Sequence, residues 1–302
     1  MTAGPTSYRA WGIAFGLGGV LAFSLRPILI KLSYAAAPVS PTTLLFLRMA
    51  LSVPFFAIVG WWLRGQAPRL ARKDWLAIGG LGLVGYYAAS FLDILGLRYV
   101  GAGVGRLILF LYPTLVLLIS FFFFGRKPGL RQVAAVVASY AGIALVVSSQ
   151  VGLTEAGRQF LLGVMFIFGS ALCYSVYLVA GSEVVKRVGS MRFTAYSMMV
   201  STVPAVLQFF LLEHPAAALD LPAAVWGYAI VLATFSTVLP MFLQAEALKR
   251  IGANHFALLG AVGPVSVAVT SALGLDEPFT WRQAAGGALV IAGVLLVSLK
   301  RS

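Results

Sequence analysis

Three arginines lie inside long apolar stretches of this chain, where a charge is costly. Arg26, Arg48 and Arg106 each lie a few residues from one end of an apolar run, and a charge there costs roughly 2.5–3.5 kcal/mol on insertion scales. At the rise of a helix all three lie roughly 8–10 Å from the same end of their runs, and Asp93 lies at a similar depth. A guanidinium binds a carboxylate through paired hydrogen bonds. These four residues therefore predict a cationic site for a carboxylate.

A structural role is the alternative for the same four residues. Asp93 would then pair with one arginine, while the other two would bond backbone carbonyls or extend toward solvent. Both hypotheses stay open at the level of the sequence.

Aromatic residues accompany the charges. A tyrosine hydroxyl needs a partner when it leaves water, so tyrosines inside apolar runs favour a shared interior over lipid. An amphipathic cavity for aromatic or aliphatic amino acids fits this pattern, and lipid-facing or interfacial rings are the alternative. The aromatic candidates for the lining are Tyr86, Tyr87, Phe91, Tyr112, Tyr174 and Tyr177.

Composition sets the class of protein. Apolar residues make up 60% of the 302 residues and charged residues only 10%, which is too few to cover a water-soluble domain. The net charge of +13 falls between the apolar runs, so it indicates membrane topology and not nucleic-acid binding. His214, His255 and the single Cys173 have no neighbours at metal-ligand or nucleophile spacing. We expect an integral membrane protein that is not an enzyme and has no cofactor and no metal.

Ten apolar runs are long enough to cross a bilayer core of about 30 Å as helices. Backbone in lipid must satisfy its own hydrogen bonds, so the predicted fold class is all-α. The shortest connections are expected at residues 98–102 and 250–253. The runs lie near residues 10–31, 41–63, 74–97, 100–124, 130–149, 159–182, 191–212, 222–247, 252–274 and 281–299.

Loop charge predicts the direction of insertion. Of the 22 Lys and Arg residues, three are the arginines above, and four lie in loops on one side, namely Lys31, Arg98, Arg158 and Arg282. The other 15 lie on the opposite side or near the chain ends, because 22 minus 3 minus 4 is 15. Basic loops stay in the cytoplasm. We therefore expect both termini to be cytoplasmic.

The sequence repeats at an offset of 151 residues without a gap, which divides it into residues 1–151 and 152–302. A tandem duplication is the simplest explanation. Five spans per copy is an odd number, so the second copy must enter the membrane from the opposite face. Inverted repeats of this kind are typical of secondary transporters, which hold the substrate between the copies. The matched pairs include Gly101/Gly252, Pro113/Pro264, Arg131/Arg282 and Gly142/Gly293.

The arginines are not repeated. Tyr177, Met199 and Ala257 stand 151 positions after Arg26, Arg48 and Arg106. The predicted site is therefore asymmetric.

Three segments carry a family resemblance: LGLRYVGAGVGRLILFLYPTLVLLIS at 95–120, AEALKRIGANHFALLGAVGPVSVAVTS at 245–271, and LGLDEPFTWRQAAGGALVIAGVLLVS at 273–298. They resemble the ten-helix EamA-type exporters of the drug/metabolite transporter superfamily, and among these the bacterial inner-membrane amino-acid exporters of the YddG type. Glu277 keeps the acidic turn residue of this family, whereas Arg126 replaces it in the first half. The resemblance implies alternating access through a central cavity lined by the first, third, fourth, sixth, eighth and ninth spans.

Pro113 and Pro264 occupy matching positions in the fourth and ninth spans. Each removes a backbone donor and frees the carbonyl four residues earlier, at Leu109 and Gly260. Hinges that open the cavity are one interpretation, and fixed bends that shape it are the other.

Together these features predict a secondary transporter that exports small metabolites, amino acids including aromatic ones, across the bacterial inner membrane by alternating access. The absence of a carboxylate at mid-depth other than Asp93 favours facilitated movement over proton exchange. The expected partners are the small-molecule substrate and the lipid bilayer, with no nucleic acid, and a monomer is favoured over an oligomer. The alternatives are a drug or organic-cation exporter, a phosphorylated-metabolite exchanger of the same architecture, and a non-transporting membrane scaffold.

Overall fold

The computed structural model describes residues 5–64, 70–125, 129–148, 154–214, 216, 220–275, 277 and 280–298. Every regular element in these residues is a helix, as the sequence predicts. The expected boundary between the copies, at residues 151 and 152, lies outside the described residues. So do five of the basic residues used to predict topology, namely Arg69, Arg126, Lys127, Lys300 and Arg301.

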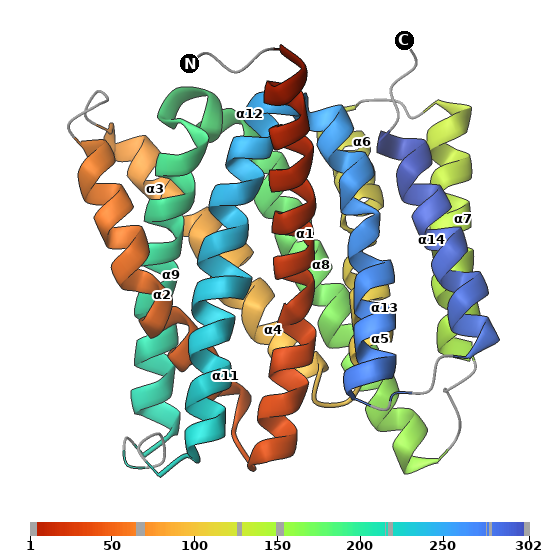
Figure 1. Cartoon of the computed structure of the whole chain (residues 1–302), viewed down its shortest axis with the longest axis horizontal. Helices are drawn as coiled ribbons and strands as arrows, with labels where there is room; N and C mark the ends of the chain where they lie inside the picture. Colours follow the sequence, from red (N-terminus) through yellow and green to blue (C-terminus); the bar gives the residue numbers. More distant parts are fainter. Residues whose placement is uncertain are drawn as a thin grey trace.

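The helices stand side by side with nearly parallel axes (Figure 1). In chain order they are α1 (Pro5–Ala36), α2 (Pro41–Arg64), α3 (Arg72–Gly82), η1 (Leu83–Ala88), α4 (Ala89–Gly96), α5 (Ala102–Leu109), α6 (Tyr112–Phe124), α7 (Leu130–Ser148), α8 (Glu155–Val188), α9 (Ser190–Leu212), α11 (Ala223–Ala233), η2 (Thr234–Val238), α12 (Leu239–Gly260), α13 (Val262–Gly274) and α14 (Trp281–Ser298).

Eight helical segments in the described part are long and apolar enough to cross a membrane. Two shorter apolar helices, Val262–Gly274 and Trp281–Leu296, complete the set. Most segments match the predicted runs within a few residues. The chain is thus a multi-pass membrane protein, and its count of ten spans stays a prediction.

The chain reverses direction at the turn predicted for residues 250–253, although α12 stays helical to Gly260. A Cβ on Gly12 would meet Ile251, and one on Gly16 would meet both Ala247 and Leu259, so the residues before and after Ile251 pass the same part of α1. A second interruption follows at Ala261, three residues before Pro264, because a proline has no N–H to offer to the carbonyl four residues earlier and its ring crowds that carbonyl. The equivalent turn in the first half, between Gly96 and Ala102, lies at its predicted position.

Irregular helix geometry recurs at the offset of the sequence repeat. The π-helix η2 begins at Thr234, 151 positions after Leu83, where the π-helix η1 begins. The interruption at Ala261 likewise stands 151 positions after Phe110, where the fourth span is interrupted. Single π-helical turns within α-helices often mark functional positions.

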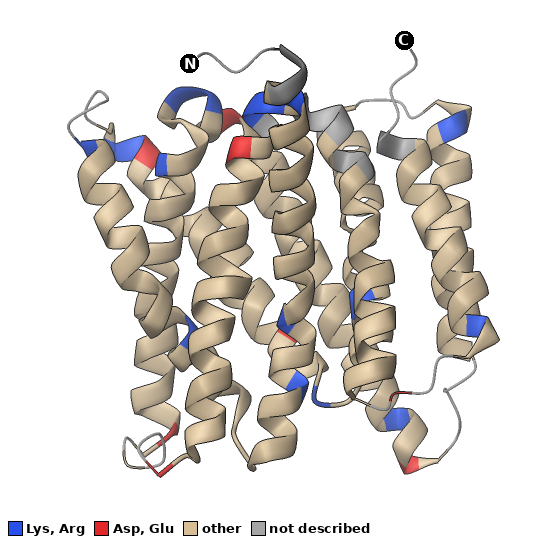
Figure 2. Cartoon of the chain, in the orientation of Figure 1, with Lys and Arg blue, Asp and Glu red and all other residues tan. Residues whose placement is uncertain are grey.

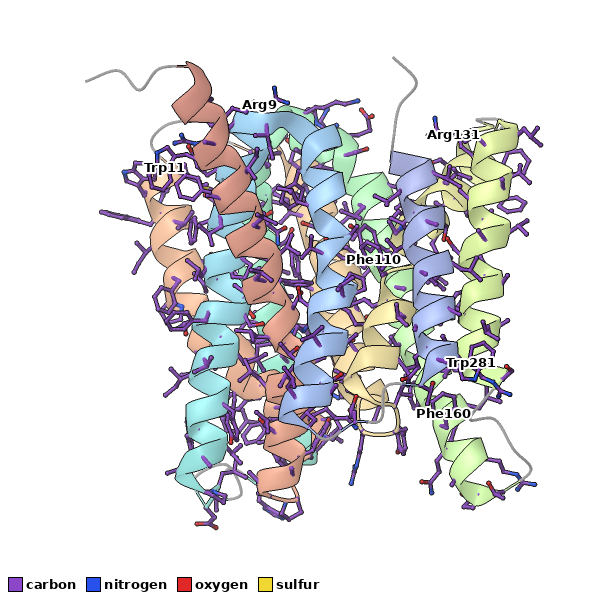
Figure 3. All side chains as sticks on the ribbon, turned by 45° about the vertical axis from the view of Figure 1, so that its right-hand side comes forward. Arg9, Trp11, Phe110, Arg131, Phe160 and Trp281 are labelled. Carbon is purple, nitrogen blue, oxygen red and sulfur yellow. The ribbon has the colours of Figure 1, made fainter. Side chains whose placement is uncertain are left out.

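Matching helices of the two halves run in opposite directions. α7 begins near Arg131 at one end of the bundle, whereas α14 begins near Trp281 at the other end (Figure 3). Likewise α1 begins at the end of the bundle where α8 finishes (Figure 1).

The pair α7 and α14 packs with almost no space between the backbones. A Cβ placed on Gly142 would lie 2.5 Å from the carbonyl oxygen of Gly286, and one on Gly293 would lie 2.6 Å from that of Ala135. Small residues allow such close approach in membranes. Small residues of α7 and α14 therefore pack against each other within one chain.

The two ends of the bundle differ in charge. Lys and Arg gather at the end where α1 begins and α14 finishes (Figure 2). That end carries the basic residues at the end of α2, the start of α3, the start of α7 and the end of α8, which are Arg64, Arg72, Lys73, Arg131, Lys186 and Arg187.

Candidate functional site

A cavity of about 560 Å³ lies between helices of both halves. All six spans that the resemblance implied contribute to its lining, which runs from Val20 of α1 to Gly260 of α12. α2 also contributes, through the predicted Arg48 and through Phe56, and α9 contributes through Phe193 among others. The family resemblance did not include these two spans.

Seven of the ten sequence-predicted site residues line this cavity. They are Arg26, Arg48, Tyr86, Arg106, Tyr112, Tyr174 and Tyr177. The structure thus brings the three arginines and four of the six aromatic candidates together around one space.

Arg26 is paired. Its Nη2 lies 3.1 Å from Oδ2 of Asp93, and the two residues are only 8% and 5% exposed. Asp93 itself is not part of the lining, so it lies behind Arg26 and cancels that charge. This pair follows the structural hypothesis for one of the three arginines.

Arg48 is held from one side only. Its Nε donates to Thr237 Oγ1 at 3.1 Å, and the Thr237 hydroxyl donates in turn to the carbonyl of Leu232 at 2.8 Å. That carbonyl is five residues earlier, a spacing that the wide turn of η2 allows. Arg48 is 3% exposed, and its Nη1 has no hydrogen-bond partner among the described residues. A buried guanidinium therefore borders the cavity with a free donor.

Arg106 lies on an aromatic ring. Its guanidinium carbon is 4.6 Å from the centre of the Phe23 ring, a cation–π contact, and its buried Nε has no hydrogen-bond partner in the described part of the chain. Asp93 thus forms an ion pair with Arg26, whereas Arg48 and Arg106 form no ion pair with a described acid.

Tyrosines form an aromatic wall beside the arginines. The hydroxyl of Tyr177 donates to that of Tyr86 at 3.2 Å, and the ring of Tyr174 lies 5.3 Å from Tyr112 and 6.1 Å from Tyr177 between centres. Gly85, in the π-helix η1, leaves the space that the Tyr177 ring occupies, because a Cβ there would collide with it.

Three candidates do not reach the cavity. Tyr87 donates to Gln208 Oε1 at 3.0 Å, and Phe91 packs against the buried core. With Asp93 behind Arg26, these residues support the helices around the site and do not line it.

Pro113 and Pro264 are also absent from the lining, but each follows an interruption in its span. In both cases the preceding carbonyl accepts a hydrogen bond from a serine of the other half of the sequence. Ser175 Oγ donates to the carbonyl of Tyr112 at 3.1 Å, and Ser24 Oγ donates to that of Gly263 at 3.3 Å. Each hydroxyl shares its one proton with a closer carbonyl in its own helix, that of Ala171 at 2.6 Å and that of Val20 at 2.8 Å. The structure therefore shows a short interruption of each helix before its proline, and the role of these two positions as hinges stays a prediction.

Thr237, Phe23 and the contribution of α9 are absent from the sequence-based prediction. A usable signal for Thr237 is the polar pair Ser236-Thr237 within an otherwise apolar run, since both residues line the cavity. Phe23 lies three residues before Arg26, a spacing that places two side chains on one helix face.

The cavity reaches the surface near the junction of α8 and α9. Ser182 and Ser190 line it and are exposed. This junction lies at the end of the bundle where α1 begins (Figure 1). Phe110, another lining residue, lies about midway along the bundle (Figure 3), so the space extends from that end into the interior.

At the opposite end of the bundle, Glu277 forms hydrogen bonds with the start of α5. Its Oε1 accepts from the backbone N–H of Ala102 at 2.8 Å, and its Oε2 from that of Gly103 at 3.4 Å. A carboxylate at a helix N-terminus satisfies free donors and complements the helix dipole. Glu277 thus joins the segment between α13 and α14 to the start of α5.

Known transporters are similar to this chain over most of its length. A family model described as the EamA-like transporter family matches residues 10–148 and again residues 161–299. The chain is 30% identical over 275 residues to the uncharacterized transporter YcbK of Bacillus subtilis, covering 89% of this chain and 86% of YcbK. An uncharacterized transporter of Archaeoglobus fulgidus is 24% identical over 296 residues, covering 96% and 95%.

A crystal structure has the same fold. It superposes with a TM-score of 0.66 at 17% identity and covers 94% of this chain and 95% of its own. At that identity the likeness concerns the fold alone.

Proposed function

Because this chain belongs to the EamA-like transporter family, we propose that it is a ten-span secondary transporter that exports small carboxylate-bearing metabolites, a class that includes amino acids. The observation that carries this proposal is the cavity with two guanidinium groups, Arg48 and Arg106, that have buried free donors and no acid partner among the described residues.

The proposed architecture is two inverted five-helix copies, residues 1–151 and 152–302. The two matches of the family model support it, because they are offset by 151 residues at both ends, from 10 to 161 and from 148 to 299. The opposite directions of α7 and α14 support inversion (Figure 3). A substrate held between inverted copies is a recurrent arrangement of secondary transporters.

We place the protein in the inner membrane of a bacterium. In the proposed orientation, the end of the bundle where α1 begins faces the cytoplasm. The gathering of Lys and Arg at that end supports it (Figure 2), since basic residues favour the cytoplasmic side. The mouth near Ser182 and Ser190 then faces the cytoplasm, which is the side from which an exporter loads its substrate.

Alternating access would require the cavity to close at this mouth and open at the other end. The contact of Glu277 with Ala102 and Gly103 holds the outer end closed in this conformation. The helix breaks before Pro113 and Pro264 supply positions at which half of a span can move. Substrate then drives transport only through its different affinities for the two conformations.

The lining argues against an organic-cation exporter. Arg48 and Arg106 would repel a cation, and no acid is among the lining residues that the structure describes. A phosphorylated-metabolite exchanger would suit the arginines, but most of the remaining lining is apolar or aromatic, as at Leu109, Phe110 and Met241. A carboxylate on an apolar body fits both parts of the cavity.

Reconstituted transport is the direct test. Purified protein in proteoliposomes would be offered amino acids, other monocarboxylates, quaternary amines and sugar phosphates, and counterflow of each would be measured. We expect counterflow of carboxylate compounds only. Transport confined to quaternary amines or sugar phosphates would assign one of the other functions, and no transport of any compound would favour a scaffold.

A further inference from the structure

The cavity has an unbalanced charge that a substrate must meet. Asp93 forms an ion pair with Arg26 at 3.1 Å, whereas Arg48 and Arg106 form no ion pair with a described acid, so three guanidinium groups face one carboxylate. Arginine stays protonated in proteins and offers only donors. A buried, uncompensated charge is unfavourable until an opposite charge arrives. A negatively charged ligand therefore gains stabilisation here that a neutral one does not.

The free donors show where that negative charge can bind. Arg48 is only 3% exposed, and its Nη1 lacks a partner among the described residues while its Nε is fixed by Thr237. Arg106 presents a second unpartnered donor, its Nε, with its planar group resting on Phe23. Both side chains line the cavity, and neither of these buried donors would give up another hydrogen bond to meet a carboxylate oxygen.

The described lining of the cavity holds no Asp or Glu that could pair with a cationic amine. The face of Phe23 that could receive a cation is occupied by Arg106 at 4.6 Å. The hydroxyls of Tyr86 and Tyr177 bond each other at 3.2 Å. An ammonium group would therefore enter a space that is already positive and find few acceptors.

The rest of the wall matches an apolar or aromatic body. The rings of Phe110, Tyr112 and Tyr174 stand in edge-to-face contacts, with centres 6.2 Å and 5.3 Å apart, and Leu109 and Met241 extend the apolar surface. Aromatic rings stack or meet edge-on with a ring brought by a ligand.

We infer that the cavity selects organic anions that carry a carboxylate on an apolar or aromatic body and have no cationic amine, in preference to zwitterionic amino acids. This inference rests on the proposed function and narrows its substrate class. A zwitterion brings one charge that the arginines attract and one that they repel, whereas the deaminated acid of the same size brings only the first.

Matched ligand pairs test this selection. Purified full-length protein in detergent would be titrated calorimetrically at pH 7.5 with 3-phenylpropionate and phenylalanine, with 4-methylpentanoate and leucine, and with phenethylamine, which lacks the carboxylate. We expect each deaminated acid to bind at least tenfold more tightly than its parent amino acid, about 1.4 kcal/mol, and phenethylamine not to bind. Equal or tighter binding of the amino acids, or binding of none of the acids, overturns the inference.

Variants separate recognition from folding. In Arg106→Gln we expect the affinity ratio of acid to amino acid to fall toward one, whereas Arg106→Lys keeps the charge and should keep a ratio above one. Arg158→Gln removes an exposed charge outside the lining and should leave the ratio unchanged. A misfolded variant would lose affinity for both ligands together and would not change their ratio alone. An unchanged ratio in both Arg106→Gln and Arg48→Gln overturns the inference.

The two proposals fail in different measurements. If an amino acid binds as tightly as its deaminated acid and is transported, the selectivity inference fails and the proposed function stands. If no carboxylate compound is transported in proteoliposomes, the proposed function fails whatever the binding ratios are.

Discussion

Ser24 and Ser175 make the same hydrogen bond with the two halves of the chain exchanged. Ser24 donates to the carbonyl of Gly263 at 3.3 Å, and Ser175, 151 positions later, donates to that of Tyr112, which stands 151 positions before Gly263. When the numbering is shifted by 151 residues, the donor of one contact becomes the donor of the other, and the acceptors exchange in the same way. A two-fold relation between two copies produces such a pair of contacts. They add a side-chain detail to the support for the proposed inverted repeat.

Thiol labelling in intact cells tests the proposed topology. In a background with Cys173→Ser, we expect a membrane-impermeant maleimide to label Arg158→Cys at the start of α8 and not Arg187→Cys at its end. Both positions are exposed, so a difference reports the side of the membrane. Labelling after permeabilisation is the control for reactivity. The reverse pattern would place the termini outside and contradict the orientation.

Thr237 should control how well Arg48 binds a carboxylate. Thr237→Val removes the acceptor of Arg48 Nε, and a lost hydrogen bond to a charged group costs about 1.5–3 kcal/mol. We expect substrate affinity to fall about tenfold or more. Thr237→Ser keeps the hydroxyl and should retain most of the affinity. Equal affinity in the valine and wild-type proteins would show that Arg48 is not a ligand of the substrate.

Glu277 should stabilise the closed outer end. Glu277→Gln weakens two hydrogen bonds to the start of α5, and we expect a loss of about 1–2 kcal/mol. The melting temperature of the detergent-solubilised protein would fall, and thiol access from outside to a cysteine near the Ala102 turn would rise. Glu155→Gln, an exposed carboxylate at the start of α8, is the control. Unchanged access in Glu277→Gln would rule out a role in closure.

The contact between α7 and α14 should not tolerate one added methyl group. Gly142→Ala would place a Cβ 2.5 Å from the Gly286 carbonyl oxygen, and overpacking of this kind costs about 1–3 kcal/mol. Gly293→Ala should cost a similar amount, because its position is equivalent. Gly227→Ala in α11 meets nothing within 4 Å and should leave thermal stability unchanged. Equal melting temperatures for all three variants would contradict this close backbone contact.

Transport should be insensitive to pH between 6 and 8. No acid and no histidine is among the described lining residues, and the one acid behind the lining, Asp93, is paired with Arg26. We therefore expect counterflow of a carboxylate substrate to keep its rate across this range in proteoliposomes. Accumulation that follows an imposed proton gradient would instead indicate proton exchange.

Charge and periodicity predict most of the architecture. Helices follow from the backbone's need for hydrogen bonds in lipid, and Arg26, Arg48 and Arg106 stand out because so few charges lie in apolar runs. The reversal near Ile251 lies where the charged pair Lys249 and Arg250 separates two apolar runs, but the sequence does not show that the helix continues through it to Gly260.

The details of the site depend on rotation about each helix axis, which the sequence does not specify in apolar spans. Neighbours on a helix point about 100° apart, so Tyr86 and Tyr87 could not both face the cavity, and composition alone does not choose between them. The π-helical segments η1 and η2 rotate the side chains that follow them about the helix axis, relative to an uninterrupted α-helix. For this reason the contact of Arg48 with Thr237 is visible only in three dimensions.

The glycine contact of α7 with α14 limits how the molecule can change shape. Backbone meets backbone at Gly142 and at Gly293, so these two helices cannot slide along each other without steric collision. They lie at one edge of the bundle (Figure 1), and neither lines the cavity. In any switch between inward and outward openings, α7 and α14 must therefore move together as one rigid unit, and the other helices must rotate relative to them.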